Sequence, residues 1–240
     1  MVPNRMRLLM KPLLVFDLDG TMVDTATDLI SALNATLAEE GLSPIPTSEV
    51  GYLVGAGGRV MIERGLKYHG RDTTPTELDA LQARFASHYS SHMPGKSAPF
   101  PGLIAALDLF EAAGWRFAVC TNKLEGLSRQ LLDGLGLSAR LDAICGGDTF
   151  AVRKPDARHL LGTIKAAGGD RARTVMIGDS RADIDAAKNA GIPVVAVSFG
   201  YTDTPVAELG PDRIIDHFDA LWGAVADLMP PNEVANGRSA

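Results

Sequence analysis

Short apolar runs alternate with helix-like segments through the second half of the chain, and this alternation limits the folds that are available. The apolar runs cover residues 116–120, 143–145, 174–177 and 194–197, with 214–215 as a candidate edge strand. The helix-like segments share an amphipathic spacing and cover 103–113, 124–135, 157–167, 182–190 and 217–228. Strands joined by helical crossovers pair in parallel, and strands buried on both faces are apolar throughout. The pattern therefore predicts an α/β fold with a parallel sheet covered by helices on both faces.

A separate block of helix-like sequence follows the first apolar run, 13–16. Apolar residues recur at helical spacing in 25–40, and further helical segments occur around 59–68 and 76–89, with no alternating strand pattern among them. Thr25 is expected to cap the first of these helices. We interpret the block as a small helical module.

A proline- and glycine-rich stretch, 94–102, ends this block and is typical of a hinge or domain boundary. The first apolar run is expected to join the later strands in one sheet, so the helical module is an insertion within its own domain. We therefore predict a Rossmann-like core formed by residues 1–22 and 96–240, with a small α-helical cap at 23–95.

Composition and charge exclude several classes of protein. With 46% hydrophobic and 22% charged residues among 240, the chain can bury a core and is not expected to be disordered. The net charge of −6 argues against nucleic-acid or acidic-membrane binding, which depends on clustered Lys and Arg. Two cysteines, Cys120 and Cys145, lie in or beside apolar runs and are expected to be buried free thiols of a reducing compartment.

The two ends of the chain give weaker signals. Arg5 and Arg7 precede an apolar stretch in the manner of a leader, but Lys11-Pro12 interrupt it and no small-residue cleavage site follows. No apolar run approaches the roughly 20 residues of a membrane span. We expect a cytoplasmic protein with no membrane contact, whose last residues, 231–240, are frayed.

Two carboxylates follow the first apolar run, in the segment Phe16-Asp17-Leu18-Asp19-Gly20-Thr21. Side chains alternate along a strand, so Asp17 and Asp19 project from the same face where the strand ends. Ligands bind at the carboxyl ends of the strands in open α/β sheets. The pair can hold a hard cation, attack an electrophile or shuttle a proton, and the segment alone does not decide among these.

Other strand ends carry polar groups that suit the same site. Thr121-Asn122-Lys123 follows the run at 116–120, Lys154-Pro155 lies in a later loop, and Gly178-Asp179-Ser180 with Asp183 follows the run at 174–177. Alone, Thr121 is typical of a turn or cap, Lys154 of a solvated lysine and Gly178-Asp179-Ser180 of a helix cap. Together, at one edge of a parallel sheet, they offer carboxylates, a hydroxyl and an ammonium, which is the set that phosphoryl transfer requires.

These four segments resemble the four motifs of the haloacid dehalogenase superfamily of hydrolases. The resemblance spans 13 to about 228, and the helical insert is similar to the small cap of that superfamily's first cap class. Within the superfamily, the segments 23–29, 54–58 and 121–123 are most similar to bacterial phosphoglycolate phosphatases.

The resemblance implies a role for each motif residue. Asp17 would be the nucleophile that forms an aspartyl-phosphate, and Asp19 the acid that protonates the leaving alkoxide and then activates water. Two neighbouring carboxylates oppose double ionisation, which favours a protonated Asp19. Mg²⁺ would be held by Asp17, the backbone carbonyl of Asp19 and Asp179, with Asp183 in support. The substrate-binding residues would be Thr121, Asn122 and Lys154.

The implied function is Mg²⁺-dependent hydrolysis of 2-phosphoglycolate to glycolate and phosphate. The alternatives are a phosphatase for another small ester, such as a sugar phosphate or pyrophosphate, and a sugar phosphomutase. An acid at Asp19 counts against dehalogenation and carbon-phosphorus cleavage, and a binding protein without turnover is the remaining class. Arg59 is either a contact for a substrate carboxylate or a solvated helix residue. A closing cap is expected, while monomer and homodimer remain open.

Overall fold

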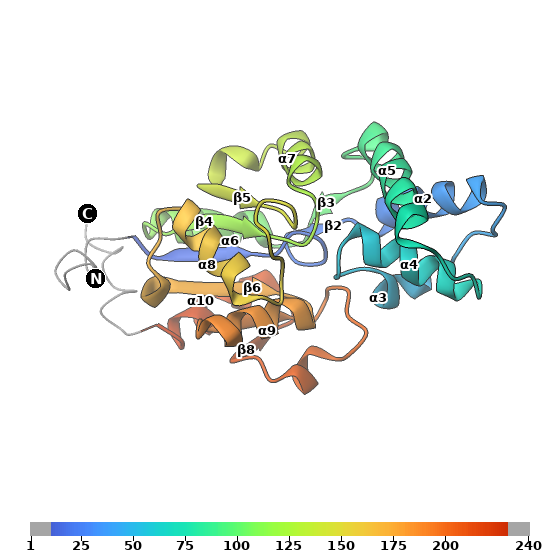
Figure 1. Ribbon diagram of the computed structural model, residues 1–240. Helices are drawn as coiled ribbons and strands as arrows, with labels where there is room; N and C mark the ends of the chain where they lie inside the picture. Colours follow the sequence, from blue (N-terminus) through green and yellow to red (C-terminus); the bar gives the residue numbers. More distant parts are fainter. Residues whose placement is uncertain (1–10, 230–240) are drawn as a thin grey trace.

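A six-stranded parallel sheet with helices on both faces forms the core of the molecule, and a helical module lies to one side of it (Figure 1). The computed structural model describes residues 11–229. The strands are β1 (Leu13–Phe16), β4 (Arg116–Cys120), β5 (Ala143–Cys145), β6 (Thr174–Gly178), β7 (Val194–Val197) and β8 (Arg213–Ile215). Their spatial order is β5-β4-β1-β6-β7-β8, and every neighbouring pair is parallel. The predicted fold class is confirmed.

Alternate residues of β1 belong to two different apolar clusters, one on each face of the sheet. Leu14 and Phe16 pack with side chains from helices on one face, and Leu13 and Val15 pack with those on the other. The first face is covered by α6 (Leu103–Ala112), α7 (Glu125–Gly134) and α10 (Leu221–Ala226), the second by α8 (Ala157–Ala166) and α9 (Arg181–Ala190). Burial on both faces explains why the strands lack polar alternation.

The last helix is shorter than the sequence predicts. In place of one helix over 217–228, a 3₁₀ turn at Phe218–Ala220 leads into α10. The side chain of His217 accepts the N–H of Asp219 and so starts the turn. Gly223 in the short α10 is a weak helix former. The predictions for Arg5, Arg7 and the frayed end at 231–240 lie outside the described residues.

The helical module contains α2 (Ala26–Glu39), α3 (Val50–Leu53), α4 (Gly58–Tyr68) and α5 (Pro75–His92). These helices enclose a third apolar cluster, to which Leu33, Ile62 and Phe85 contribute fully buried or nearly buried side chains. The module therefore has a core of its own, which touches one cluster of the sheet through Met93 and Phe100. None of the helices within 11–229 is long and apolar enough to cross a membrane.

The two connections between the module and the sheet pair with each other. β2 (Val23–Asp24) and β3 (Ala98–Pro99) form a two-stranded antiparallel ribbon. The sequence gives no sign of it, because a strand of two residues has no measurable alternation. The predicted hinge at 94–102 thus contains a strand that is tied to the other connection. Cys120 and Cys145 end adjacent strands as buried free thiols, as predicted.

Candidate active site

Three strands end at one edge of the sheet and place the predicted site residues there. Asp17 follows β1, and its N–H extends the strand ladder by donating to the carbonyl of Ile177 on β6, at 2.9 Å. Thr121 follows β4, and its N–H donates in the same way to Cys145 of β5, at 3.0 Å. Asp179 follows β6 directly. The strand ladder therefore fixes the backbone of the site.

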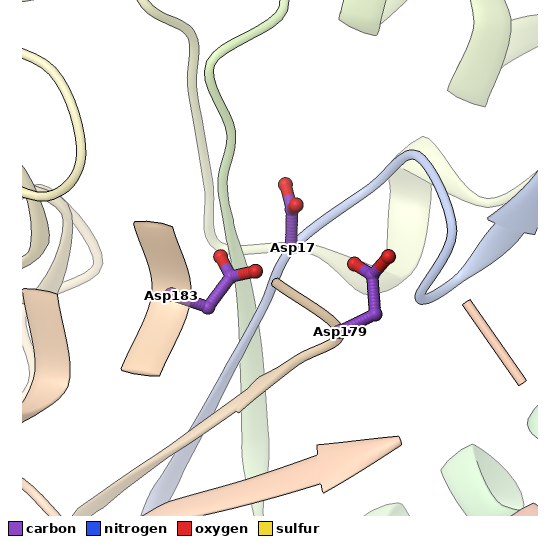
Figure 2. Close-up of side chains that lie close together, drawn as sticks. All are labelled: Asp17, Asp179 and Asp183. Carbon is purple, nitrogen blue, oxygen red and sulfur yellow. The ribbon is translucent and has the colours of Figure 1, made fainter. Parts of the chain in front are cut away.

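Asp17, Asp179 and Asp183 form a compact cluster of buried carboxylates. Figure 2 shows the three side chains lying close together, and one oxygen of each lies within 4.8 Å of the others. Burial, with repulsion from Asp183, raises the pKa of Asp17 to about 7. Burial and the other two carboxylates also raise the pKa of Asp179 well above its usual range. Oxygen donors that repel one another in a buried site fit a hard cation.

Hydrogen bonds fix the orientation of two members of this cluster. Asp179 accepts the hydroxyl of Thr21 at 2.8 Å on one oxygen and the N–H of Tyr201 at 2.6 Å on the other. Asp183 accepts the N–H and hydroxyl of Ser180 on a single oxygen, at 3.0 and 2.6 Å, which forms a capping box at the start of α9. The sequence predicted no role for Tyr201, because the loop that contains it carries no recognisable pattern.

Lys154 joins two of the carboxylates and is itself fully buried. Its Nζ lies 2.9 Å from Asp17 and 2.5 Å from Asp183. Burial alone lowers the pKa of Lys154, but the charges of Asp17 and Asp183 outweigh burial and the pKa is raised. Lys154 therefore remains an ammonium and holds one oxygen of Asp17, Oδ1, which also accepts the N–H of Leu18 at 2.7 Å. Both oxygens of Asp183 are engaged, one by Lys154 and one by Ser180.

Asp19 has different partners from Asp17. Nζ of Lys123 lies 2.8 and 3.1 Å from its two carboxylate oxygens, and the hydroxyl of Thr25 donates to Oδ1 at 2.8 Å. Thr25 occupies the N-cap position of the first helix, as predicted, but its side chain makes no capping bond to α2 because its hydroxyl donates to Asp19. The proton expected on Asp19 stays a prediction, and in the structure its carboxyl oxygens lie beside the ammonium of Lys123.

The three residues that follow β4 each have a different place in the site. The hydroxyl of Thr121 is buried and accepts the N–H of Lys123 at 3.2 Å. The amide of Asn122 donates to the carbonyl of Lys154 at 3.2 Å, while its Oδ1 is buried with no partner among the described residues. Asn122 thus holds the loop that carries Lys154, and its contact with substrate stays a prediction. Lys123 was part of the quoted motif but had no predicted role.

A cavity separates this edge of the sheet from the helical module. Its core side includes Asp17, Asp19 and Thr121, and its module side includes Arg59 and Tyr89. It brings together groups far apart in the sequence, which could not be placed from the sequence alone.

Arg59 lines the cavity but already has partners. Its guanidinium forms an ion pair with Asp79 and also donates to the carbonyl of Pro75 at 3.3 Å. The sequence left two possibilities for Arg59, a contact with substrate and a solvated side chain. The structure favours neither a free substrate contact nor a fully solvated side chain. The pair with Asp79 lies at the exposed side of the module.

Known proteins are similar to this chain in sequence and in fold. The profile described as haloacid dehalogenase-like hydrolase matches residues 14–197. A phosphoglycolate phosphatase of Agrobacterium fabrum is 52% identical over 220 residues, which cover 92% of this chain and 94% of that protein. The crystal structure of a predicted phosphoglycolate phosphatase from Haemophilus somnus superposes with a TM-score of 0.82 at 27% identity, covering 90% of this chain and 98% of that chain.

A third similar protein was solved with a sugar bisphosphate. It is a variant of CbbY from Rhodobacter sphaeroides in complex with xylulose-1,5-bisphosphate, and it superposes with a TM-score of 0.74 at 25% identity. The match covers 87% of this chain and 95% of that chain. Because the family profile matches well over half of the sequence and the Agrobacterium protein is similar over nearly the whole length, this chain belongs to the haloacid dehalogenase-like hydrolases.

Proposed function

We propose that the chain is a Mg²⁺-dependent phosphomonoesterase that hydrolyses 2-phosphoglycolate to glycolate and phosphate. The observation that supports this chemistry is that two neighbouring carboxylates have different cationic partners. Asp17 contacts Lys154, and Asp19 contacts Lys123. The substrate is supported by the 52% identity to a phosphoglycolate phosphatase. Residues 1–22 and 96–240 would form the catalytic core, and 23–95 the cap that covers it.

Asp17 is the proposed nucleophile. The N–H of Leu18 and the ammonium of Lys154 both contact Oδ1, so they orient the carboxylate and leave Oδ2 as the attacking oxygen. Oδ2 bonds to phosphorus as the bond from phosphorus to the ester oxygen breaks, which yields an aspartyl-phosphate. Lys154 and the hydroxyl of Thr121 offset negative charge on the phosphoryl oxygens, and Asn122 holds the loop of Lys154 in place.

Asp19 is the proposed acid and base. In the form that carries a proton, Asp19 gives that proton to the departing glycolate oxygen. As a carboxylate it then takes a proton from the water that attacks phosphorus and releases phosphate from Asp17, which restores the acid. To reach the ester oxygen, Asp19 has to loosen its contacts with Lys123 or Thr25. Because Lys123 and Thr25 lie on opposite sides of the junction between core and cap, movement of the cap provides a way to change them.

The cluster of Asp17 and Asp179 would hold Mg²⁺ together with the backbone carbonyl of Asp19. Asp183 would support the site through Lys154 and Ser180, because both of its oxygens already have partners. When bound, the metal supplies positive charge that shields the phosphoryl group from the carboxylates. The donor set fits this ion, since all side-chain donors are carboxylate oxygens.

A phosphate-release assay tests the proposal. We expect 2-phosphoglycolate to be the preferred ester in a panel that includes sugar phosphates, a sugar bisphosphate and pyrophosphate, and EDTA to remove the activity. A sugar bisphosphate as the preferred substrate would favour the chemistry of the CbbY complex instead. Retention of phosphate on a rearranged sugar would indicate a mutase. The buried free thiols at Cys120 and Cys145 support a reducing compartment, and we propose the cytoplasm.

A further inference from the structure

A buried ammonium at the cavity, that of Lys123, has been described so far only as a partner of Asp19. The side chain of Lys123 is 5% exposed and lines the cavity between core and cap. Its Nζ contacts both oxygens of Asp19, the hydroxyl of Tyr89 at 3.0 Å, and lies 4.2 Å from the centre of the Tyr89 ring. A core residue is thus bonded to a cap residue beside the proposed acid.

Lys123 keeps its charge in this position. Burial lowers the pKa of Lys123, but the Asp19 carboxylate and the Tyr89 hydroxyl outweigh burial and the net effect raises it. Burial also raises the pKa of Tyr89, so its hydroxyl stays neutral and retains a proton to donate. An ammonium and a phenol side by side form a pair of donors suited to an anion.

The position of Lys123 matches the spacing of charges in the proposed substrate. Asp19 protonates the ester oxygen from about 2.7 Å, and Nζ of Lys123 is 2.8 Å from Asp19, so Nζ lies within about 6 Å of that oxygen. In 2-phosphoglycolate one methylene separates the ester oxygen from the carboxylate, which puts the carboxylate oxygens about 3 to 3.5 Å away. The remaining gap is about the length of one hydrogen bond.

We propose that Lys123, assisted by the hydroxyl of Tyr89, binds the carboxylate of the substrate and so makes the enzyme selective for short phosphorylated hydroxy acids. This inference rests on the proposed function, because it names the group that recognises the same substrate. Asp19 turns toward the ester oxygen and releases an N–H of Lys123, and the substrate carboxylate takes its place. Tyr89 belongs to α5, so the carboxylate subsite is complete only with the cap in contact.

The other cations near the cavity are less suited to this role. Arg59 is held by Asp79 and by the carbonyl of Pro75 on the exposed side of the cap. Arg153 lines the cavity but is an exposed residue. A cation at the surface gains little from pairing with an anion, because water and salt screen the attraction. Lys123 is the cation that is both buried and adjacent to the proposed acid.

The test compares two esters that differ only at the group in question. Ethyl phosphate carries a methyl group where 2-phosphoglycolate carries its carboxylate. For Lys123→Met we expect the ratio of the two kcat/KM values, 2-phosphoglycolate over ethyl phosphate, to fall about 10- to 100-fold, the size of a lost charge-assisted hydrogen bond. Tyr89→Phe should lower the ratio by a few-fold. Arg59→Met should leave the ratio unchanged, and Lys67→Met, at an exposed lysine of α4, should leave both rates unchanged.

An equal loss on both esters in Lys123→Met would mean that Lys123 only orients Asp19, and would overturn the proposal. Should that variant not fold, Lys123→Gln keeps a donor for Asp19 without the charge and carries the same comparison. A wild-type enzyme with no preference for 2-phosphoglycolate would instead contradict the proposed function.

A binding measurement separates recognition from turnover. Asp17→Asn cannot form the aspartyl-phosphate, so this variant binds the intact esters, which keep the oxygen toward which Asp19 turns. Calorimetry with Mg²⁺ should show tighter binding of 2-phosphoglycolate than of ethyl phosphate to Asp17→Asn by about tenfold or more, and no difference between the two esters when Lys123→Met is added. Equal binding of both esters to Asp17→Asn would overturn the carboxylate subsite whatever the rate of hydrolysis.

Discussion

The charged pairs at the edge of the sheet and those on the helical cap differ in how far they are exposed to solvent. Lys154 and Asp183 at the sheet edge have fully buried side chains, whereas Arg59 and Asp79 on the cap are 31% and 70% exposed. Loss of one partner in a buried pair leaves an uncompensated charge, which costs about 3–5 kcal/mol. An exposed pair is worth about 1 kcal/mol or less. The core therefore holds its charges in one arrangement, while the cap can exchange its surface pairs at little cost.

Removal of the proposed nucleophile tests the core at its most sensitive point. In Asp17→Asn we expect kcat to fall by about four orders of magnitude or more, because a neutral amide cannot form the aspartyl-phosphate. The fold should persist, since the amide has the shape of the carboxylate. Phosphate release and circular dichroism measure the two effects. Asp133→Asn, at an exposed position of α7, is the matched control, and full turnover in Asp17→Asn would rule out this nucleophile.

Stability measurements on one cation from each region test the contrast directly. Lys154→Met leaves Asp17 and Asp183 without their ammonium, so we expect the free energy of unfolding to fall by about 3–5 kcal/mol in metal-free urea titrations. Arg59→Met should lower it by about 1 kcal/mol or less. Equal losses of unfolding free energy in the two variants would show that burial does not make the charges of the core more important for stability than those of the cap.

The carboxylate cluster makes metal binding depend on pH. In the metal-free protein the pKa of Asp17 is about 7 against an ordinary value of 3.8, so between those pH values the folded chain keeps a proton that the unfolded chain has lost. Stability of the metal-free form therefore falls as pH rises through this window. The metal displaces this proton and any proton that the raised pKa keeps on Asp179, so the Kd for Mg²⁺ should fall by about tenfold per pH unit for each proton displaced, at least up to pH 7.

Calorimetry at pH 5.5, 6.5 and 7.5 measures this dependence. Asp183→Asn removes a charge that raises the pKa of Asp17. The pH range over which the Kd for Mg²⁺ falls should therefore move to lower pH. A Kd that stays constant over the range would show that Asp17 is already ionised before the metal binds.

Tyr201 connects the two regions, and removal of its hydroxyl tests that connection. Its hydroxyl donates to Asp24 of β2 and accepts the N–H groups of Thr25 and Ala26, at 2.9 and 3.0 Å, while its own N–H donates to Asp179. Tyr201→Phe loses the hydroxyl contacts, which should cost about 1–2 kcal/mol of unfolding free energy.

The metal site should not change in Tyr201→Phe, because the backbone N–H that contacts Asp179 remains. Calorimetric Kd values for Mg²⁺ within about twofold of the wild type would fit this expectation, and a large loss of affinity would show that the junction controls the metal site. Tyr68→Phe, at an exposed tyrosine of α4, serves as the control.

Local patterns in the sequence are enough to predict the sheet and the carboxylates at its edge. The apolar run before Asp17 and the run before Asp179 are contiguous in sequence with the residues that they place, so alternation and strand ends suffice. Contacts between distant segments are different. Tyr201 lies 177 residues from Asp24 in the sequence, and Lys123 lies 34 residues from Tyr89. These contacts depend on how the cap packs against the core, and no periodic pattern encodes that packing.

The resemblance to a known family supplied roles but not partners. It placed Asp17 and Asp19 in one motif, and only the structure shows that one is bonded to Lys154 and the other to Lys123 and Thr25. Thr25 illustrates the reason. Its position just before α2 suits a helix cap, but a hydrogen bond to the half-buried carboxylate of Asp19 is stronger than one to a backbone amide of the helix.

The ribbon of β2 and β3 makes the segment between them an exchangeable cassette. Because the two strands lie side by side, the chain leaves the core and returns to it at a single point. A segment of any length whose ends meet at that point could replace residues 25–97 without shifting β1 or β4, since loop length alone costs little free energy. Transplanting the corresponding segment between related enzymes is therefore a direct route to new substrate preferences, provided that the new segment replaces the contacts of Thr25 with Asp19 and of Tyr89 with Lys123.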